Sequence, residues 1–163
     1  MKFKTTPYHF DLLKDEERLS AFYEAINELS TSQELAYDLG CGSGILSFFL
    51  NSYFKEIIAI EQDFKASRCA KENLKSFKNI EVVNEDVLKY DFSKKCDLIV
   101  CEMLDTALID EEEVPVLNHA RNYLKENGKI IPQGIINTIE LAHLERDYIP
   151  VSYTHLTLPT KLE

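Results

Sequence analysis

Four acidic residues in this chain stand at or just after the ends of apolar stretches, where their carboxylates could bind a positively charged ligand. These acids are Asp38, Glu61, Asp86 and Glu102. Each one alone is more often a turn residue or a helix cap. Together, at successive strand ends, they predict a site that attracts cations and accepts hydrogen bonds from hydroxyl groups.

A glycine-rich segment adjoins the first of these acids. Residues 37–46 read YDLGCGSGIL, and glycine lets the backbone turn sharply and approach a ligand closely. The dinucleotide-binding pattern G-x-G-x-x-G is excluded, because Ile45 stands where its last glycine would follow Gly40. Asp38 would also repel a pyrophosphate, whereas carboxylates attract the ammonium and sulfonium groups of S-adenosylmethionine. We therefore predict that this cofactor binds here, with loop contacts at Asp38, Gly40, Gly42 and Gly44.

Two further acids are predicted to bind the same cofactor. Glu61 lies 21 residues after Gly40, at the end of the next strand, where it can accept hydrogen bonds from both ribose hydroxyls. Asp86 follows the third strand and is placed to bind the amino group of adenine. The glycine loop and these two acids, at successive strand ends, favour a cofactor site over separate turns and caps.

Alternating strands and helices are predicted to hold these residues in place. Continuous apolar runs predict buried strands, and apolar residues at helical spacing predict helices. The predicted strands are 35–40, 57–61, 80–83, 96–102 and 129–131, and the predicted helices are 15–30, 44–54, 63–77 and 114–124. Asn127-Gly128 is the expected stop signal of the last helix. This alternation indicates an α/β fold with a doubly wound, mainly parallel sheet, which binds ligands beyond the carboxyl ends of its strands.

The composition is that of a globular domain with an acidic surface. The 163 residues are 45% hydrophobic and carry a formal net charge of −10, which disfavours unaided binding to nucleic acid. No apolar run is long enough to span a membrane, and the first residues lack the apolar region of a signal peptide, so we expect a cytoplasmic protein. The four cysteines show no zinc-like spacing, and we expect reduced thiols and no metal site.

The segments YDLGCGSGIL, IIAIEQDF, NEDV and CDLIVCE together resemble class I S-adenosylmethionine-dependent methyltransferases, over residues 35–132. This resemblance implies a Rossmann-like core. More specifically, the chain is similar to the protein arginine N-methyltransferases in three segments.

The first of these segments runs from His9 to Arg18 and is similar to the family's H-x-x-M-L-x-D-x-x-R sequence. The resemblance implies that the planar guanidinium of Arg18 binds the cofactor's carboxylate, and that His9 and Asp15 line the same pocket. The residues alone leave an alternative open, an ion-pair cluster of Asp15, Glu16 and Arg18 at the start of a helix.

The second segment, residues 101–111, resembles the family's double-glutamate loop. Glu102 and Glu111 keep the nine-residue spacing of that loop, which implies two catalytic acids that hold a protonated guanidinium in line with the sulfonium methyl. Glu111 could also belong to an acidic first turn of a helix at 110–113, which the helix dipole favours. The aromatic residues of the family's loop are absent, since this chain reads EMLDT from residue 102.

The third segment, GKIIP at 128–132, resembles the strand and proline that lead into the family's C-terminal β-barrel. Residues 1–134 are therefore predicted to form the cofactor-binding core with its N-terminal helix, and 135–150 to begin a β unit that is missing from this chain. The final residues, 151–163, continue no pattern, and VSYTHLTLPT resembles a translated transposase adapter from sequencing libraries. We expect these residues to be a non-native tail.

Together these features predict a methyltransferase that acts on a nitrogen of a protein side chain, with arginine as the favoured acceptor and a cationic protein as the partner. The resemblance implies that a homodimer would form only in the full-length protein, and that this stretch alone could be inactive. An RNA methyltransferase on the same core stays open, although EMLD at 102–105 lacks the D/N-P-P-[YFW] pattern of enzymes that modify base amino groups. A non-catalytic scaffold is the other alternative, but it would have no reason to place Glu102 beside a sulfonium.

Overall fold

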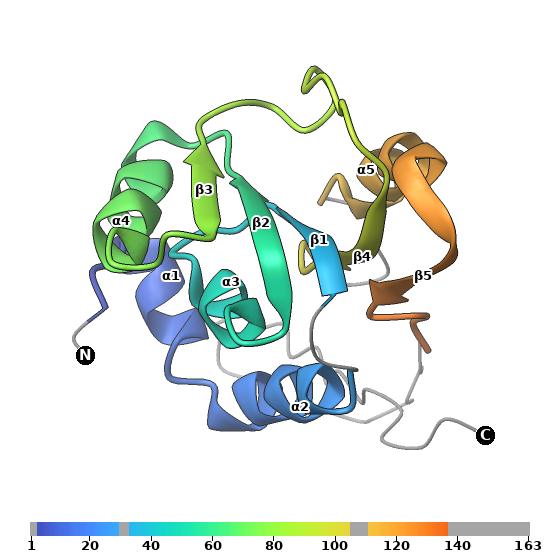
Figure 1. Ribbon diagram of the computed structural model, residues 1–163. Helices are drawn as coiled ribbons and strands as arrows, with labels where there is room; N and C mark the ends of the chain where they lie inside the picture. Colours follow the sequence, from blue (N-terminus) through green and yellow to red (C-terminus); the bar gives the residue numbers. More distant parts are fainter. Residues whose placement is uncertain (1–2, 30–32, 105–110, 137–163) are drawn as a thin grey trace, which may run out of the picture.

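The computed structural model describes residues 3–29, 33–104 and 111–136, which contain a five-stranded sheet (Figure 1). The strands are β1 (Gln33–Leu39), β2 (Phe54–Ile60), β3 (Ile80–Val83), β4 (Cys96–Cys101) and β5 (Leu124–Ile131). Neighbouring strands are parallel, in the order β3-β2-β1-β4-β5. The order therefore reverses at β1, and ligands bind at this point in doubly wound sheets. The predicted α/β, Rossmann-like fold class is confirmed.

Helices cover both faces of the sheet. They are α1 (Pro7–Leu12), α2 (Glu16–Asn27), α3 (Ile45–Leu50), α4 (Phe64–Leu74) and α5 (Glu113–Ala120), with a 3-10 turn at Arg121–Tyr123. Neighbouring residues of β4 show this two-sided burial. Ile99 belongs to one core with Val116 of α5, and Val100 belongs to another with Phe22 of α2. Because both faces are covered, the strands read as continuous apolar runs.

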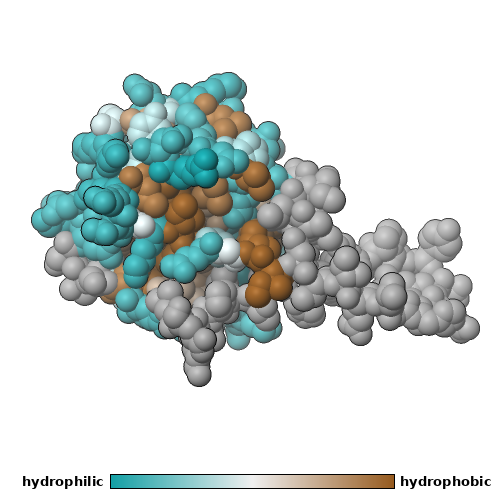
Figure 2. Space-filling view, turned by 90° about the vertical axis from the view of Figure 1, so that its right-hand side faces the viewer, coloured by the Kyte–Doolittle hydropathy of each residue, from teal (hydrophilic) through white to brown (hydrophobic). Residues whose placement is uncertain are grey.

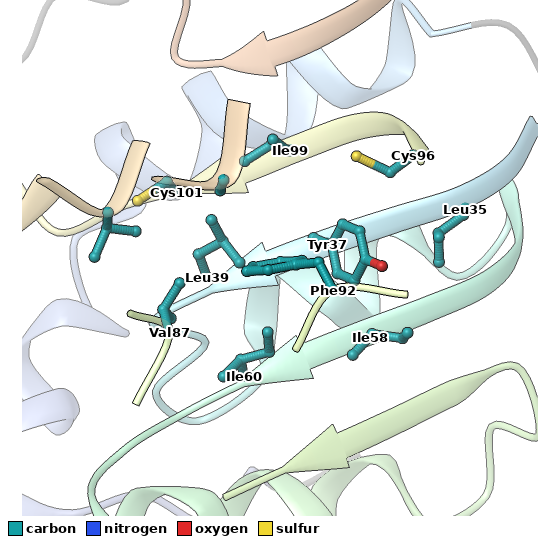
Figure 3. Close-up of a cluster of buried hydrophobic side chains, with 12 residues drawn as sticks. Leu35, Tyr37, Leu39, Ile58, Ile60, Val87, Phe92, Cys96, Ile99 and Cys101 are labelled. Carbon is teal, nitrogen blue, oxygen red and sulfur yellow. The ribbon is translucent and has the colours of Figure 1, made fainter. Parts of the chain in front are cut away.

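Two aromatic rings, those of Tyr37 and Phe92, lie among aliphatic and cysteine side chains in the core on the α5 side (Figure 3). The rings of Tyr37 and Phe92 meet edge-on with their centroids 4.9 Å apart. The Tyr37 hydroxyl donates a hydrogen bond of 3.0 Å to the Lys94 carbonyl, which satisfies its only polar group. Leu39 and Cys101 extend the same core to the carboxyl ends of β1 and β4. The strand ends that carry the predicted site thus rest on a packed core.

The N-terminal region forms two helices, whereas the sequence pattern predicts one helix at 15–30. Thr6 caps α1 and Pro7 occupies its first position, which is a common way for a helix to begin. Asp15 caps α2 by accepting a hydrogen bond of 2.9 Å from Arg18 N. The break between the helices allows α1 to turn toward the glycine-rich loop.

The last helix and strand also differ from their predicted boundaries. The helix predicted at 114–124 ends at Ala120, and the fifth strand begins at Leu124. Asn127-Gly128 therefore lies inside β5 and stops no helix. The pairing between β4 and β5 is irregular here. Two successive residue pairs are two residues apart along β4 but five residues apart along β5. This irregularity in the pairing accommodates the Asn-Gly sequence within the strand.

The β5 edge of the sheet faces the viewer in Figure 2, where hydrophobic residues gather in the middle of the face and hydrophilic residues lie around them.

Most of the β unit predicted at 135–150, and all of the tail predicted at 151–163, lie outside the described residues and stay predictions. Within the described part of the chain, none of the helices combines the length and the apolar character needed to cross a membrane.

Candidate active site

A cavity of about 630 Å³ lies at the carboxyl ends of the strands, and residues of α1 also line it. Its volume is in the range of small-molecule sites, about 300–1,000 Å³. Eight of the ten predicted site residues line it, namely His9, Arg18, Gly40, Gly42, Glu61, Asp86, Glu102 and Glu111. The other two, Asp38 and Gly44, are not among the lining residues.

The glycine-rich loop passes close to the His9 side chain. Gly42 has a φ of +53°, and a Cβ added to it would lie 2.8 Å from the His9 ring. Thr6 holds this ring in place, because its Oγ1 lies 2.7 Å from His9 Nδ1. The same hydroxyl accepts a hydrogen bond of 3.4 Å from His9 N. The close approach of α1 to the loop therefore requires glycine at position 42.

Gly42→Ala is expected to destabilise the protein by about 1–3 kcal/mol, because alanine is strained at positive φ and its methyl group would displace the His9 ring. Affinity for a ligand of the cavity should fall as well. Urea unfolding and binding calorimetry measure the two effects. Gly134→Ala is the matched control, since a Cβ there meets no atom within 4 Å. Equal losses in the two variants would contradict the packing argument.

Arg18 reaches the cavity from α2, and its side chain is 10% exposed. Its Nη1 donates to Glu102 Oε2, and its Nη2 donates to the Leu12 carbonyl at 2.8 Å. Nε is buried and has no hydrogen-bond partner in the described part of the chain. The Asp15 carboxylate lies 4.0 Å from Nε, so the alternative of an ion pair at the start of the helix is present only as a long contact. Because a buried N–H without a partner is costly, Nε is a donor suited to a bound ligand.

Glu61 links the loop after β1 to the start of α4. Its Oε2 accepts a hydrogen bond of 2.8 Å from Gly42 N, and its Oε1 accepts one of 2.8 Å from Asp63 N. The residue is 7% exposed and lines the cavity. Each carboxylate oxygen can accept a second hydrogen bond. Glu61 is therefore held rigidly by backbone donors and can still accept hydroxyl groups of a ligand.

Asp86 lies in the turn after β3, on the cavity wall. Its Oδ1 accepts a hydrogen bond of 2.9 Å from Leu88 N, and its Oδ2 lies 2.9 Å from Lys89 Nζ. The hydrogen bond from Lys89 is the main reason that the pKa of Asp86 is lowered. The carboxylate is therefore kept ionised, and the turn fixes its orientation.

Glu102 and Arg18 form an ion pair inside the cavity, with 16% of the glutamate side chain exposed. Burial raises the pKa of the Glu102 carboxyl, and the Arg18 guanidinium opposes this rise. The sequence assigns Arg18 to a ligand carboxylate and Glu102 to a cationic acceptor. The structure brings the two side chains into direct contact, which no local pattern in the sequence predicts.

Glu111 and Tyr8 both line the cavity, and no pattern in the sequence singles out Tyr8. Burial raises the pKa of Tyr8, and the charge of Glu111 and a hydrogen bond to it raise this pKa further. The start signal of α1 at Thr6-Pro7 could have identified the helix that carries this tyrosine. The segment 105–110, between the two glutamates, lies outside the described residues.

The structure places Asp38 and Gly44 on the core side of the loop instead of in the cavity. Asp38 is 1% exposed and accepts a hydrogen bond from Ser47 Oγ. Gly44 caps α3, and a Cβ added to it would lie 2.6 Å from Leu74 Cδ1 of α4. Both positions therefore support the loop. The sequence predicts that both residues contact the cofactor directly, but neither of them lines the cavity.

Asp38 is expected to make stability depend on pH. Burial raises its pKa to about 6, whereas an unfolded aspartate titrates near about 4. The folded state therefore binds more protons between these values, and its free energy of unfolding should fall by about 3 kcal/mol as the pH rises through them. Asp38→Asn, which keeps an acceptor for Ser47, should lack this loss. Urea unfolding of both proteins from pH 4 to 7 measures the difference, and a constant difference would contradict the prediction.

Relatives of this chain include methyltransferases. Residues 36–128 match the family model described as a methyltransferase domain. An uncharacterized protein of Methanothermobacter thermautotrophicus is 56% identical over 140 residues, which are 86% of this chain and 55% of that protein. The ribosomal protein L11 methyltransferase of Thermoanaerobacter pseudethanolicus is 32% identical over 119 residues, which are 71% of this chain and 36% of that protein. The chain thus spans little more than half the length of the first of these relatives.

Two solved structures share this arrangement of strands and helices. Trypanosoma brucei PRMT1, in an enzyme–prozyme heterotetrameric complex with AdoHcy, has a TM-score of 0.70 and 24% identity, covering 77% of this chain and 42% of that chain. Protein arginine methyltransferase 10 of Arabidopsis thaliana has a TM-score of 0.69 and 25% identity, covering 78% of this chain and 39% of that chain. These likenesses support the fold derived above.

Proposed function

The chain belongs to the methyltransferase domain family, and on this premise we propose that the whole protein transfers a methyl group from S-adenosylmethionine to a protein side-chain nitrogen, with arginine as the acceptor. The observation that carries the choice of arginine is that the carboxylates of Glu102 and Glu111 line one cavity, where together they can accept hydrogen bonds from two nitrogens of one guanidinium. Glu102 also contacts the Arg18 guanidinium, which uses part of its capacity to accept hydrogen bonds. A carboxylate accepts up to about four hydrogen bonds, so Glu102 can hold a second guanidinium beside that of Arg18.

The cavity fits S-adenosylmethionine, the cofactor of this class of methyltransferase. The buried Nε of Arg18 is a donor without a partner among the described residues and would bind the cofactor's carboxylate. Glu61 would accept the ribose hydroxyls, and Asp86 would accept a hydrogen bond from adenine. At Gly42, the missing side chain lets the His9 ring of α1 lie against the loop, where both residues line the cavity. When bound, S-adenosylmethionine supplies an electrophilic methyl group on a positively charged sulfur.

The chain's own acids would prepare the acceptor. A guanidinium is protonated at physiological pH and is a poor nucleophile. Glu102 and Glu111, which line one cavity, would bind it through charge-assisted hydrogen bonds and draw its positive charge away from the attacking nitrogen. They would also fix the direction in which that nitrogen points. Positioning of this kind can supply a large share of the rate enhancement.

Two measurements on the full-length protein test this function. Calorimetry should detect binding of S-adenosylmethionine, and neither NAD nor ATP should bind in its place. A labelled methyl group should then pass to a peptide whose single candidate acceptor is arginine, and pass poorly to the same peptide with lysine. Binding of NAD or ATP without S-adenosylmethionine would overturn the cofactor assignment.

The alternatives give different results in the same assays. Transfer of the label to RNA but not to the peptides would favour an RNA methyltransferase. Tight binding of S-adenosylmethionine without transfer to any of these acceptors would favour a scaffold. Preferential transfer to the lysine peptide would overturn arginine as the acceptor, while leaving a protein methyltransferase in place.

A further inference from the structure

Asn73 on α4 ties together two segments that border the cavity. The residue is 4% exposed. Its Oδ1 accepts a hydrogen bond of 2.7 Å from Lys4 N, and its Nδ2 donates to the Lys4 carbonyl at 2.7 Å and to the Ser43 carbonyl at 2.9 Å. One side-chain amide therefore fixes both backbone groups of Lys4 and one carbonyl of the glycine-rich loop.

Lys4 lies in the segment that leads into α1, and within the described residues this segment belongs to no strand. Two other contacts hold it. The Phe3 ring meets the Phe48 ring edge-on at 5.7 Å, and Lys4 Nζ lies 3.4 Å from Glu72. The ion pair is exposed, and exposed pairs contribute little stability. The buried polar anchor of the segment is therefore Asn73.

We propose that Asn73 is a positioning residue for cofactor binding, because it holds the segment before α1 and the glycine-rich loop in a fixed relation. This inference rests on the proposed function. With the amide in place, α1 is ordered against the loop before a ligand arrives, and His9 already lies over Gly42. Without the amide, this ordering must occur during binding and reduces affinity, because fixing backbone costs conformational entropy.

Asn73→Ala and Asn79→Ala form a matched pair. Asn79 also donates from Nδ2 to two backbone carbonyls, those of Asn51 at 3.0 Å and Phe54 at 2.9 Å. It lies at the other end of the strands, in a groove at their amino ends. By calorimetry, we expect Asn73→Ala to bind S-adenosylhomocysteine about 10- to 100-fold more weakly than the wild type. Asn79→Ala should change this affinity by less than about threefold.

Limited trypsin digestion without cofactor gives a second readout. Cleavage after Lys4 and Lys14, on either side of α1, should be faster in Asn73→Ala than in the wild type or Asn79→Ala. Asn73→Asp should behave like the alanine variant, because it keeps an acceptor for Lys4 N but loses both donated hydrogen bonds. Equal changes in the Asn73 and Asn79 variants, in binding and in cleavage, would overturn the inference.

The wild-type protein alone gives a third readout, which does not depend on how the variants fold. The Lys4 amide should be protected from hydrogen exchange, because it donates to a buried side chain. Exchange of this amide at the rate of an unstructured chain would overturn the inference. If the wild type binds no S-adenosylhomocysteine, the proposed function fails, whereas the cleavage and exchange rates still decide whether Asn73 positions α1.

Discussion

Glu102→Gln is expected to lower the rate of methyl transfer by about 100-fold or more. The side chain lies just after β4, is 16% exposed, and contacts Arg18. Glutamine keeps the size of the side chain and one acceptor oxygen, so Arg18 keeps a partner. The negative charge that would hold a cationic acceptor nitrogen is lost, and charge-assisted hydrogen bonds are about twice as strong as neutral ones. Initial rates of labelled-methyl transfer, at saturating S-adenosylmethionine and with the full-length protein, measure the effect.

Glu56→Gln is the matched control for this variant. Glu56 also accepts a hydrogen bond from a cation, Lys94 Nζ at 2.6 Å, but it lies at the amino ends of the strands. This substitution should leave the rate within about twofold of the wild type, because exposed ion pairs contribute little. If Glu102→Gln is as active as Glu56→Gln, Glu102 does not bind the acceptor and the mechanism is wrong.

The Glu102 carboxyl should also set the acid limb of the pH–rate profile. Its pKa is raised, chiefly by burial. The carboxylate must be ionised to bind a protonated guanidinium, so the rate should fall as the pH is lowered through this raised pKa. Glu102→Gln has no such group and should lose this limb. A limb that persists unchanged in the variant would belong to another residue.

Arg18→Lys is expected to weaken S-adenosylhomocysteine binding by about 10- to 100-fold while leaving 5′-methylthioadenosine binding nearly unchanged. The two ligands share a nucleoside, but only the first carries an amino-acid carboxylate. Arg18 uses Nη1 for Glu102 and Nη2 for the Leu12 carbonyl, and its Nε has no partner among the described residues. A lysine ammonium cannot make these contacts and donate to a ligand carboxylate in one planar arrangement. Calorimetry with both ligands measures the difference.

Glu61→Gln provides the comparison for the arginine variant. Glu61 is assigned to the ribose, which both ligands contain, so its loss should weaken both. Arg18→Lys should discriminate between them. An equal loss of both ligands in Arg18→Lys would mean that the cavity itself is disturbed, and it would contradict the carboxylate assignment.

Much of the fold was predictable because its signals are local. Buried parallel strands read as continuous apolar runs, and the central β1 and β4 were predicted to within two residues. Parallel pairing then places the carboxyl ends of all the strands at the same end of the sheet, so Glu61, Asp86 and Glu102 could be assigned to one site. The start of β5 was not predictable in this way, because it depends on an irregular register with β4.

The sequence by itself therefore determined which chemical groups gather at the carboxyl ends of the strands, since the pattern of buried residues and the direction of each strand follow from neighbouring residues. Only the tertiary structure decided which of these groups meet. Arg18 and Glu102 are 84 residues apart and pair because α2 and β4 share one hydrophobic core. Asp38 accepts a hydrogen bond from Ser47 in the core and does not line the cavity. A side chain's partner depends on how distant elements pack against each other, and local sequence patterns carry no information about that packing.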